Sequence, residues 1–134
     1  MKKLDKFIER RREIVEEIDG KPSIFGHGVG DDEHTDVKSG WHIYVTRLKL
    51  DKLKAPRREI FEALRAENIG VQVHYIPVYY HPYYQKLGYK KGLCPKAEKY
   101  YEEAITLPVF PAMKNKDVED VIYAITKVVD YYLR

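Results

Sequence analysis

The chain has 134 residues, a length that suits one domain with its own hydrophobic core. Apolar residues make up 44% of it and charged residues 34%, a balance typical of globular chains and not of disordered ones. The sequence contains no apolar run long enough to cross a bilayer and no signal-peptide core, so we expect a cytoplasmic protein without a membrane partner. The net charge of +3 comes from basic residues interleaved with acidic ones, which argues against nucleic acid as a partner.

The N-terminal part of the sequence predicts one helix and then a loop. Apolar residues recur at helical spacings over residues 2–18 and predict an amphipathic helix that Gly20 and Pro22 end. Residues 22–40 lack such periodicity, are rich in Gly, Asp and His, and predict a flexible loop. The histidines and aspartates of this loop match no metal-ligand spacing, so we predict no metal site there.

The middle of the sequence predicts a strand, a helix and a second strand. Residues 41–48 alternate aromatic and branched side chains in the manner of a covered strand. Pro56 suits the first turn of a helix that ends before Gly70, with an inner stripe of Ile60, Phe61 and Leu64. From Val71 the alternation of a strand returns and lasts until Pro77.

The last part predicts a helix that Pro95 opens, a short strand over residues 104–107, and a long helix with Asn115 as its cap and Asp117 in its first turn. Together these elements predict that residues 1–134 form one α+β domain with a small antiparallel sheet of about three strands. We expect the first and last helices to pack on one face of this sheet. The other face would then carry the polar aromatic residues.

Residues 70–85 contain an unusual density of imidazole and phenol groups. His74 and His81 suit proton transfer or contact with an anionic group, although single residues of this kind are more often structural histidines at the end of a strand or the start of a helix. The tyrosines leave a similar choice. Tyr83 and Tyr84 fit one turn of a helix that packs on the sheet, whereas rings at positions 75, 79 and 80 fit the wall of a cleft that binds a sugar.

No catalytic machinery can be assembled from this sequence alone. It offers no nucleophile beside a base, no paired acids at a defined spacing and no phosphate-binding loop. Cys94 is the one cysteine, so neither an internal disulfide nor a thiol pair is available. We therefore expect no catalytic residue in this chain.

Several segments, taken together and in order, resemble the C-terminal part of the DegT/DnrJ/StrS family of sugar aminotransferases. They are residues 4–14 (LDKFIERRREI), 39–45 (SGWHIYV), 68–78 (NIGVQVHYIPV) and 107–111 (LPVFP). The likeness runs through nearly the whole chain. Within the family it is most similar to enzymes of the PseC type, which aminate a UDP-linked 4-keto-6-deoxy amino sugar.

The resemblance implies that this chain is the small domain of a fold-type I aminotransferase. The parent enzyme would be a homodimer that uses pyridoxal phosphate (PLP) to move an amino group, from glutamate as the expected donor, to a nucleotide-linked keto sugar. The lysine that binds PLP and the acid that faces its pyridine nitrogen belong to the large N-terminal domain, which would be the missing partner of this chain. We expect the chain alone to bind no cofactor and to be inactive.

The resemblance also implies which residues border the sugar nucleotide. His74 and Tyr75, the loop after Pro77 with Tyr79 and His81, and the strand start at Trp41 and His42 match the family positions on that side of the cleft. The chain departs from the pattern at Tyr79, where many relatives carry a histidine. A phenol can donate one hydrogen bond but cannot carry a positive charge at neutral pH.

The alternative is a stand-alone α+β module for binding or interaction that keeps the fold without the chemistry. A large domain encoded in frame upstream would favour the enzyme, whereas an independent start would favour the module.

Overall fold

The computed structural model describes residues 2–21, 25 and 39–134. Most of the loop predicted over residues 22–40, with its histidines and aspartates, therefore lies outside the described residues. Phe25 is an exception, because it is 4% exposed and forms an antiparallel bridge with Leu48.

The described chain contains five α-helices, two short 3₁₀ helices and two strands. In order these are α1 (Lys2–Ile18), β1 (Tyr44–Arg47), η1 (Leu50–Lys52), α2 (Arg57–Ala66), η2 (Val78–Tyr80), α3 (Pro82–Lys86), α4 (Pro95–Glu103), β2 (Ala104–Leu107) and α5 (Asn115–Tyr132). The bounds of α1 and β2 confirm the predictions from periodicity. Gly20 adopts a φ of 67° just beyond α1, a left-handed conformation that glycine accepts without strain at a helix end.

The sheet has two strands and not the three expected. β1 pairs antiparallel with β2, with Tyr44 opposite Leu107 and Arg47 opposite Ala104. The strand predicted from Val71 is reduced to one bridge, in which Gln72 and Thr106 exchange both backbone hydrogen bonds at 3.1 and 2.8 Å. The ladder stops there because the following residues, up to Pro77, turn away from β2 and pair with no strand.

The strand predicted over residues 41–48 is also shorter than expected. It begins at Tyr44, because Trp41 has a φ of 42° and so leaves the extended conformation. Leu48, just after β1, forms a bridge with Phe25 and donates its backbone N–H to the carbonyl of Glu103 at 2.9 Å.

The start of α5 differs in a similar way from the prediction. Asn115 is the first helical residue and not the cap. The Asp117 carboxylate accepts the backbone N–H of Lys114 at 2.7 Å, which satisfies one of the free groups at the helix end. The Asn115 side chain instead accepts a hydrogen bond from Arg10 of α1 at 2.9 Å and so ties the two long helices together.

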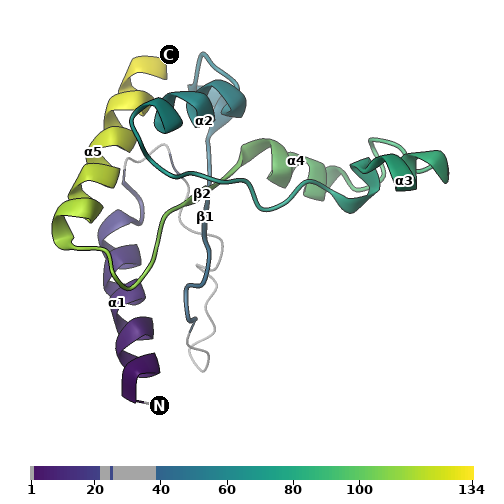
Figure 1. The fold of residues 1–134 in the computed structure, drawn as a ribbon. Coiled ribbons are helices and arrows are strands. Elements are labelled where there is room, and N and C mark those ends of the chain that lie inside the picture. Colours follow the sequence, from purple (N-terminus) through teal and green to yellow (C-terminus); the bar gives the residue numbers. More distant parts are fainter. Residues whose placement is uncertain (1, 22–24, 26–38) are drawn as a thin grey trace.

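Helices α1 and α5 lie on the same side of the strand pair, with α5 above α1 and in contact with it, and α2 packs against α5 (Figure 1). The core is built from the apolar stripes of these helices and the inner faces of both strands, with Ile14, Ile60, Ile105 and Ile125 completely buried. All four residues of β2 are buried, so this strand is covered on both faces.

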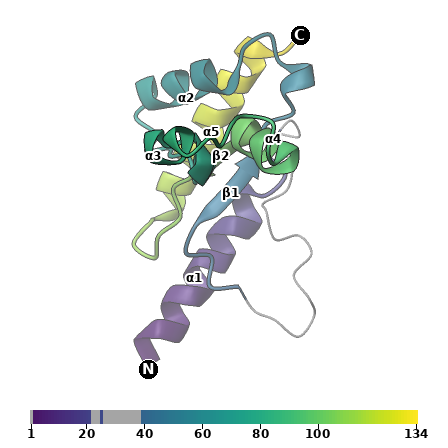
Figure 2. The same ribbon diagram turned by 90° about the vertical axis from the view of Figure 1, so that its right-hand side faces the viewer.

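Residues 77–103, called the arm below, lead away from this core. They comprise η2, α3, α4 and the connections between them, and they project to the opposite side from α1 and α5 (Figures 1 and 2). Every side chain from His81 to Ala97 is exposed. The arm therefore contributes almost nothing to the core, and its direction is set at its base.

The core assignment predicts a contrast between two positions of α5. Ile125→Ala should lower the free energy of unfolding by about 2–5 kcal/mol, because it removes buried methyl groups and leaves a cavity. Tyr123→Ala, at a side chain that is 69% exposed, should change it by about 0.5 kcal/mol or less. Urea unfolding of both variants measures the difference, and equal effects would contradict this core.

Candidate functional site

The six residues predicted from the sequence fall into two groups at opposite ends of β2. The arm returns to the body at Ala104, the first residue of β2, whereas Tyr44 of β1 lies opposite Leu107, the last. Trp41 and His42 therefore lie beyond the Leu107 end, away from the base of the arm. The other four residues belong to the arm or to the segment that leads into it.

His74 and Tyr75 lie where the chain leaves the sheet. The half-buried ring of His74 shares a hydrogen bond of 2.8 Å between its Nδ1 and the hydroxyl of Thr106. This bond leaves Nε2 as the ring nitrogen that can meet a ligand. Tyr75 is 68% exposed, and its ring stands edge-on to that of His74 with centroids 4.5 Å apart.

Tyr79 lies on the outgoing limb of the arm and bonds to the returning limb. Its hydroxyl donates to Oε1 of Glu98 at 2.7 Å, and the same oxygen accepts the backbone N–H of Gly92 at 2.6 Å. The carbonyl of Cys94 is a more distant acceptor at 3.4 Å. The hydroxyl proton of Tyr79 is thus directed to a carboxylate of the protein, and a contact of Tyr79 with substrate stays a prediction.

The contact with Glu98 changes the acidity of both partners. Burial, followed by the hydrogen bond to Glu98, raises the pKa of Tyr79 to about 12. The hydrogen bond from Tyr79 holds the pKa of Glu98 below its usual value, against the opposing effect of burial. Neutral phenol and ionised carboxylate are therefore the forms present at neutral pH.

His81 lies at the turn between η2 and α3 and is exposed. It borders the apolar surface of the arm, where Val78, Tyr83 and Leu87 are each between 59% and 67% exposed. Tyr83 and Tyr84 do form the one turn of helix that the sequence allowed, but they do not pack on the sheet.

Trp41 and His42 have different surroundings from the arm. The Trp41 ring stands edge-on to Tyr44 at 5.6 Å and closes a shallow pocket of about 200 Å³ with Arg12, Val15 and other residues of α1. His42 is exposed. The structure of this chain alone does not bring these two residues together with His74.

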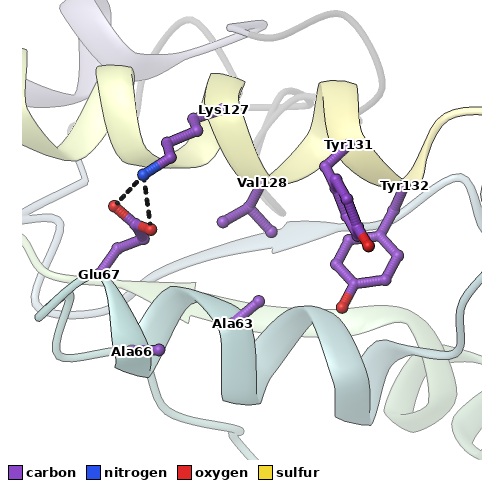
Figure 3. A pocket seen from close by; sticks show the side chains of 7 residues that line it. All are labelled: Ala63, Ala66, Glu67, Lys127, Val128, Tyr131 and Tyr132. Atoms are coloured by element: carbon purple, nitrogen blue, oxygen red, sulfur yellow. Dashed lines mark hydrogen bonds and ion pairs between the residues drawn. The ribbon is translucent and has the colours of Figure 1, made fainter.

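Among the grooves that the described residues form on the body, two of the larger ones contain none of the six residues. One, of about 430 Å³, runs between α2 and α5 over Ala63 and Val128 (Figure 3). An ion pair between Lys127 and Glu67 at 2.9 Å borders it on one side, and Tyr131 and Tyr132 lie toward the other (Figure 3). The second, of about 560 Å³, has Ile69, Phe110, Met113 and two aspartates of α5 in its lining. Neither groove gathers a catalytic group.

No group of three potential metal ligands occurs among the residues that the structure describes. None of the described helices has the length and apolar character that crossing a membrane would require.

The sequence analysis missed Glu98, which is the acid at the base of the arm and only 7% exposed. A local signal was present, because Glu98 and Tyr101 are three residues apart on α4 and so share one helical face. An acid on the face that meets the rest of the fold is unusual enough to indicate a buried partner.

This architecture is that of the small domain of fold-type I aminotransferases: a small antiparallel sheet with long helices on one side and an extension on the other. Comparison with known proteins identifies the family. Residues 1–126 match the DegT/DnrJ/EryC1/StrS aminotransferase family, and the chain belongs to it.

Two relatives and one solved structure illustrate the match. The chain is 39% identical to the spore coat polysaccharide biosynthesis protein SpsC of Bacillus subtilis, over 96% of this chain and 34% of that protein. It is 32% identical to the UDP-4-amino-4,6-dideoxy-N-acetyl-beta-L-altrosamine transaminase of Campylobacter jejuni, over 96% of this chain and 35% of that one. The PLP form of the putative sugar aminotransferase Spr1654 of Streptococcus pneumoniae superposes with a TM-score of 0.82 at 28% identity, over 96% of this chain and 32% of that one. The chain thus spans about a third of the length of the relatives it matches.

The bond between His74 and Thr106 predicts a specific effect of removing one hydroxyl. Thr106→Val should lower the free energy of unfolding by about 1 kcal/mol, because it leaves a part-buried ring nitrogen without its partner. It should also change the ¹⁵N shifts of the His74 ring, which report the tautomer. Thr106→Ser keeps the hydroxyl and is the matched control; if both variants leave the His74 shifts as in the parent chain, the bond does not exist in solution.

The pKa of Tyr79 predicts the outcome of a titration. In Glu98→Gln, that pKa should fall from about 12 toward its ordinary value of 10.0 and remain above it, because the burial persists when the charge is removed. Since the pKa is raised, the contribution of neutral Tyr79 to stability is complete below pH 10.0 and is lost as the pH rises through about 12. The ¹³Cζ shift of Tyr79 follows the ionisation, with Glu102→Gln as the control on the same helix. An unchanged pKa in Glu98→Gln would contradict the assignment.

Proposed function

We propose that this chain acts as the small-domain part of a PLP-dependent aminotransferase whose substrate is a nucleotide-linked 4-keto-6-deoxy sugar. In this role it supplies one wall of the substrate cleft and has no activity by itself. The parent would serve the synthesis of a surface polysaccharide or glycan. The observation that carries the proposal is the match over nearly all of this chain to about a third of each relative, one of which is named as a transaminase of a UDP-linked amino sugar.

The residues of this chain do not fit a complete PLP site. Every lysine whose exposure the structure describes lies at the surface. A lysine that holds an aldehyde cofactor is instead activated in a desolvated pocket or beside another cation. We therefore infer that the cofactor lysine belongs to the large domain.

What this chain offers is a polar aromatic wall for a sugar nucleotide. Nε2 of His74 and the exposed hydroxyl of Tyr75 can bond to sugar hydroxyls or phosphate, since Nδ1 of His74 is already bound to Thr106. Exposed His81 extends the same wall along the arm. Trp41 and His42 would approach this substrate from the far end of β2 only in the assembled enzyme, and their role stays a prediction.

A stand-alone interaction module is the second candidate. The apolar surface of the arm favours it, because exposed large side chains gathered on one projection are typical of a surface that meets a partner. The same surface serves the enzyme equally well, as a contact with the large domain or with the second subunit of a dimer.

Restoring a large domain tests the enzyme proposal. This chain would be fused to the part of the Campylobacter jejuni transaminase that it does not match, in place of that enzyme's own matching third. With the UDP-linked amino sugar in that enzyme's name and 2-oxoglutarate, we expect the fusion to form glutamate and the 134-residue chain alone to form none. His74→Ala in the fusion should lower kcat/KM by roughly tenfold through a weaker contact with the sugar nucleotide.

Tyr123→Ala, on the far side of α5, is the control and should leave the rate unchanged. Product from the isolated chain would overturn the claim that it is inactive. A fusion that folds as a dimer and still gives no product with this sugar would count against the substrate class.

A further inference from the structure

Two hydrogen bonds that join separate segments of the arm converge on one carboxylate. Among the described residues of the arm, only Pro77 and Glu98 are buried, and Glu98 is the charged one. Its Oε1 receives the hydroxyl of Tyr79 from the outgoing limb and the N–H of Gly92 from the returning limb. One oxygen therefore joins two segments that the chain separates by α3 and a loop.

The local backbone supports this junction. Glu98 lies in the first turn of α4, where the free N–H groups of a helix favour a negative charge. Gly92 has a φ of 97°, a conformation that glycine adopts freely, and this brings its N–H onto the carboxylate. Both features favour the ionised acid at this position.

A series of rings links the junction to the body. Tyr79 stands edge-on to Tyr80 at 5.1 Å, Tyr80 stands edge-on to Tyr101 at 6.3 Å, and the guanidinium of Arg57 lies 4.9 Å from the centre of the Tyr101 ring. Arg57 is the first residue of α2, which packs against α5. Through these ring contacts, the junction at Glu98 is connected to the core and can hold the arm in a defined position relative to it.

We propose that Glu98 is a positioning residue, which locks the two limbs of the arm together and so sets where the arm presents its exposed aromatic surface. It acts through Tyr79 and Gly92 and touches no substrate. The position of the arm beside the His74 wall matters for catalysis only if the proposed function holds, and the inference rests on it to that extent. The lock itself is a property of this chain and can be tested without cofactor or sugar.

Amide hydrogen exchange of the 134-residue chain tests the lock. Four backbone amides report on the order of the arm, because their N–H groups bond to carbonyls within it. They belong to Tyr80, His81, Gly88 and Tyr89. In Glu98→Leu these amides should exchange at least about tenfold faster, since the apolar side chain keeps the bulk and removes the acceptor of both hydrogen bonds. Amides of β1, β2 and α5 should exchange as before.

Three variants distinguish a specific link between the two limbs of the arm from a general effect on the stability of the fold. Glu98→Gln retains an acceptor oxygen and should restore most of the protection. Tyr79→Phe removes one donor without changing α4 and should accelerate exchange in the arm. Glu102→Gln, which breaks only the exposed ion pair with Lys91 at 3.1 Å, should have no such effect.

Unchanged exchange in the arm of Glu98→Leu would overturn the proposal. So would equal acceleration in the arm and the core, or an effect of Glu102→Gln as large as that of Glu98→Leu. Should Glu98→Leu fail to fold, Tyr79→Phe carries the same test from the other limb. Because no substrate enters these measurements, their failure is distinct from a failure of the aminotransferase proposal, which would appear only in the fusion enzyme.

Discussion

The fold depends on β2, a strand of four residues that is buried along its whole length. It pairs with β1 along one edge, and at Thr106 it exchanges two hydrogen bonds with Gln72. A buried strand cannot leave its polar backbone groups unpaired, so both neighbours are needed to satisfy it. The segment that leads into the arm follows Gln72, and the arm ends just before Ala104, so its base is anchored to a strand that is buried throughout.

This arrangement explains why so exposed an extension can have a defined direction. The arm buries almost no apolar surface of its own, and without its bonds at the base it would behave as a long loop. Its aromatic rings meet edge-to-face in pairs, such as Tyr84 with Tyr89, whose ring centroids are 6.1 Å apart near the tip. Such pairs add only modestly to the stability that burial of the rings provides. The hydrogen bonds at the base of the arm therefore have to hold the arm in its defined direction.

The parts of the fold that the sequence predicts well are those governed by local periodicity. The bounds of α1 and β2 follow from apolar spacing and from Gly and Pro at their ends, and the entry of α4 follows from Pro95. The predictions fail where a contact with a residue far away in the sequence determines the local structure. Asn115 bonds to Arg10 across 105 positions in place of capping its own helix, and the segment after Gln72 uses the His74 side chain to reach Thr106 where a third strand was expected to continue pairing.

The candidate site likewise contains residues that the sequence indicates and residues that it does not. The cluster around His74 and Tyr75 is recognisable from its composition and from the resemblance to a family. Glu98 is not, because its burial follows from the arm folding back on itself, and no short window of sequence contains both limbs. The separation of Trp41 and His42 from the arm likewise follows from the antiparallel register of β1 on β2, which the sequence alone does not specify.

Tyr79 now has a different meaning from the one that the sequence implied. The resemblance placed it where many relatives carry a histidine, which raised the question of a lost positive charge beside the substrate. In the structure its polar atom faces Glu98, a carboxylate that needs a hydrogen-bond donor. A phenol can donate one hydrogen bond to a carboxylate, and Tyr79 supplies that donor to Glu98. In this chain Tyr79 therefore contributes first to how the arm is held.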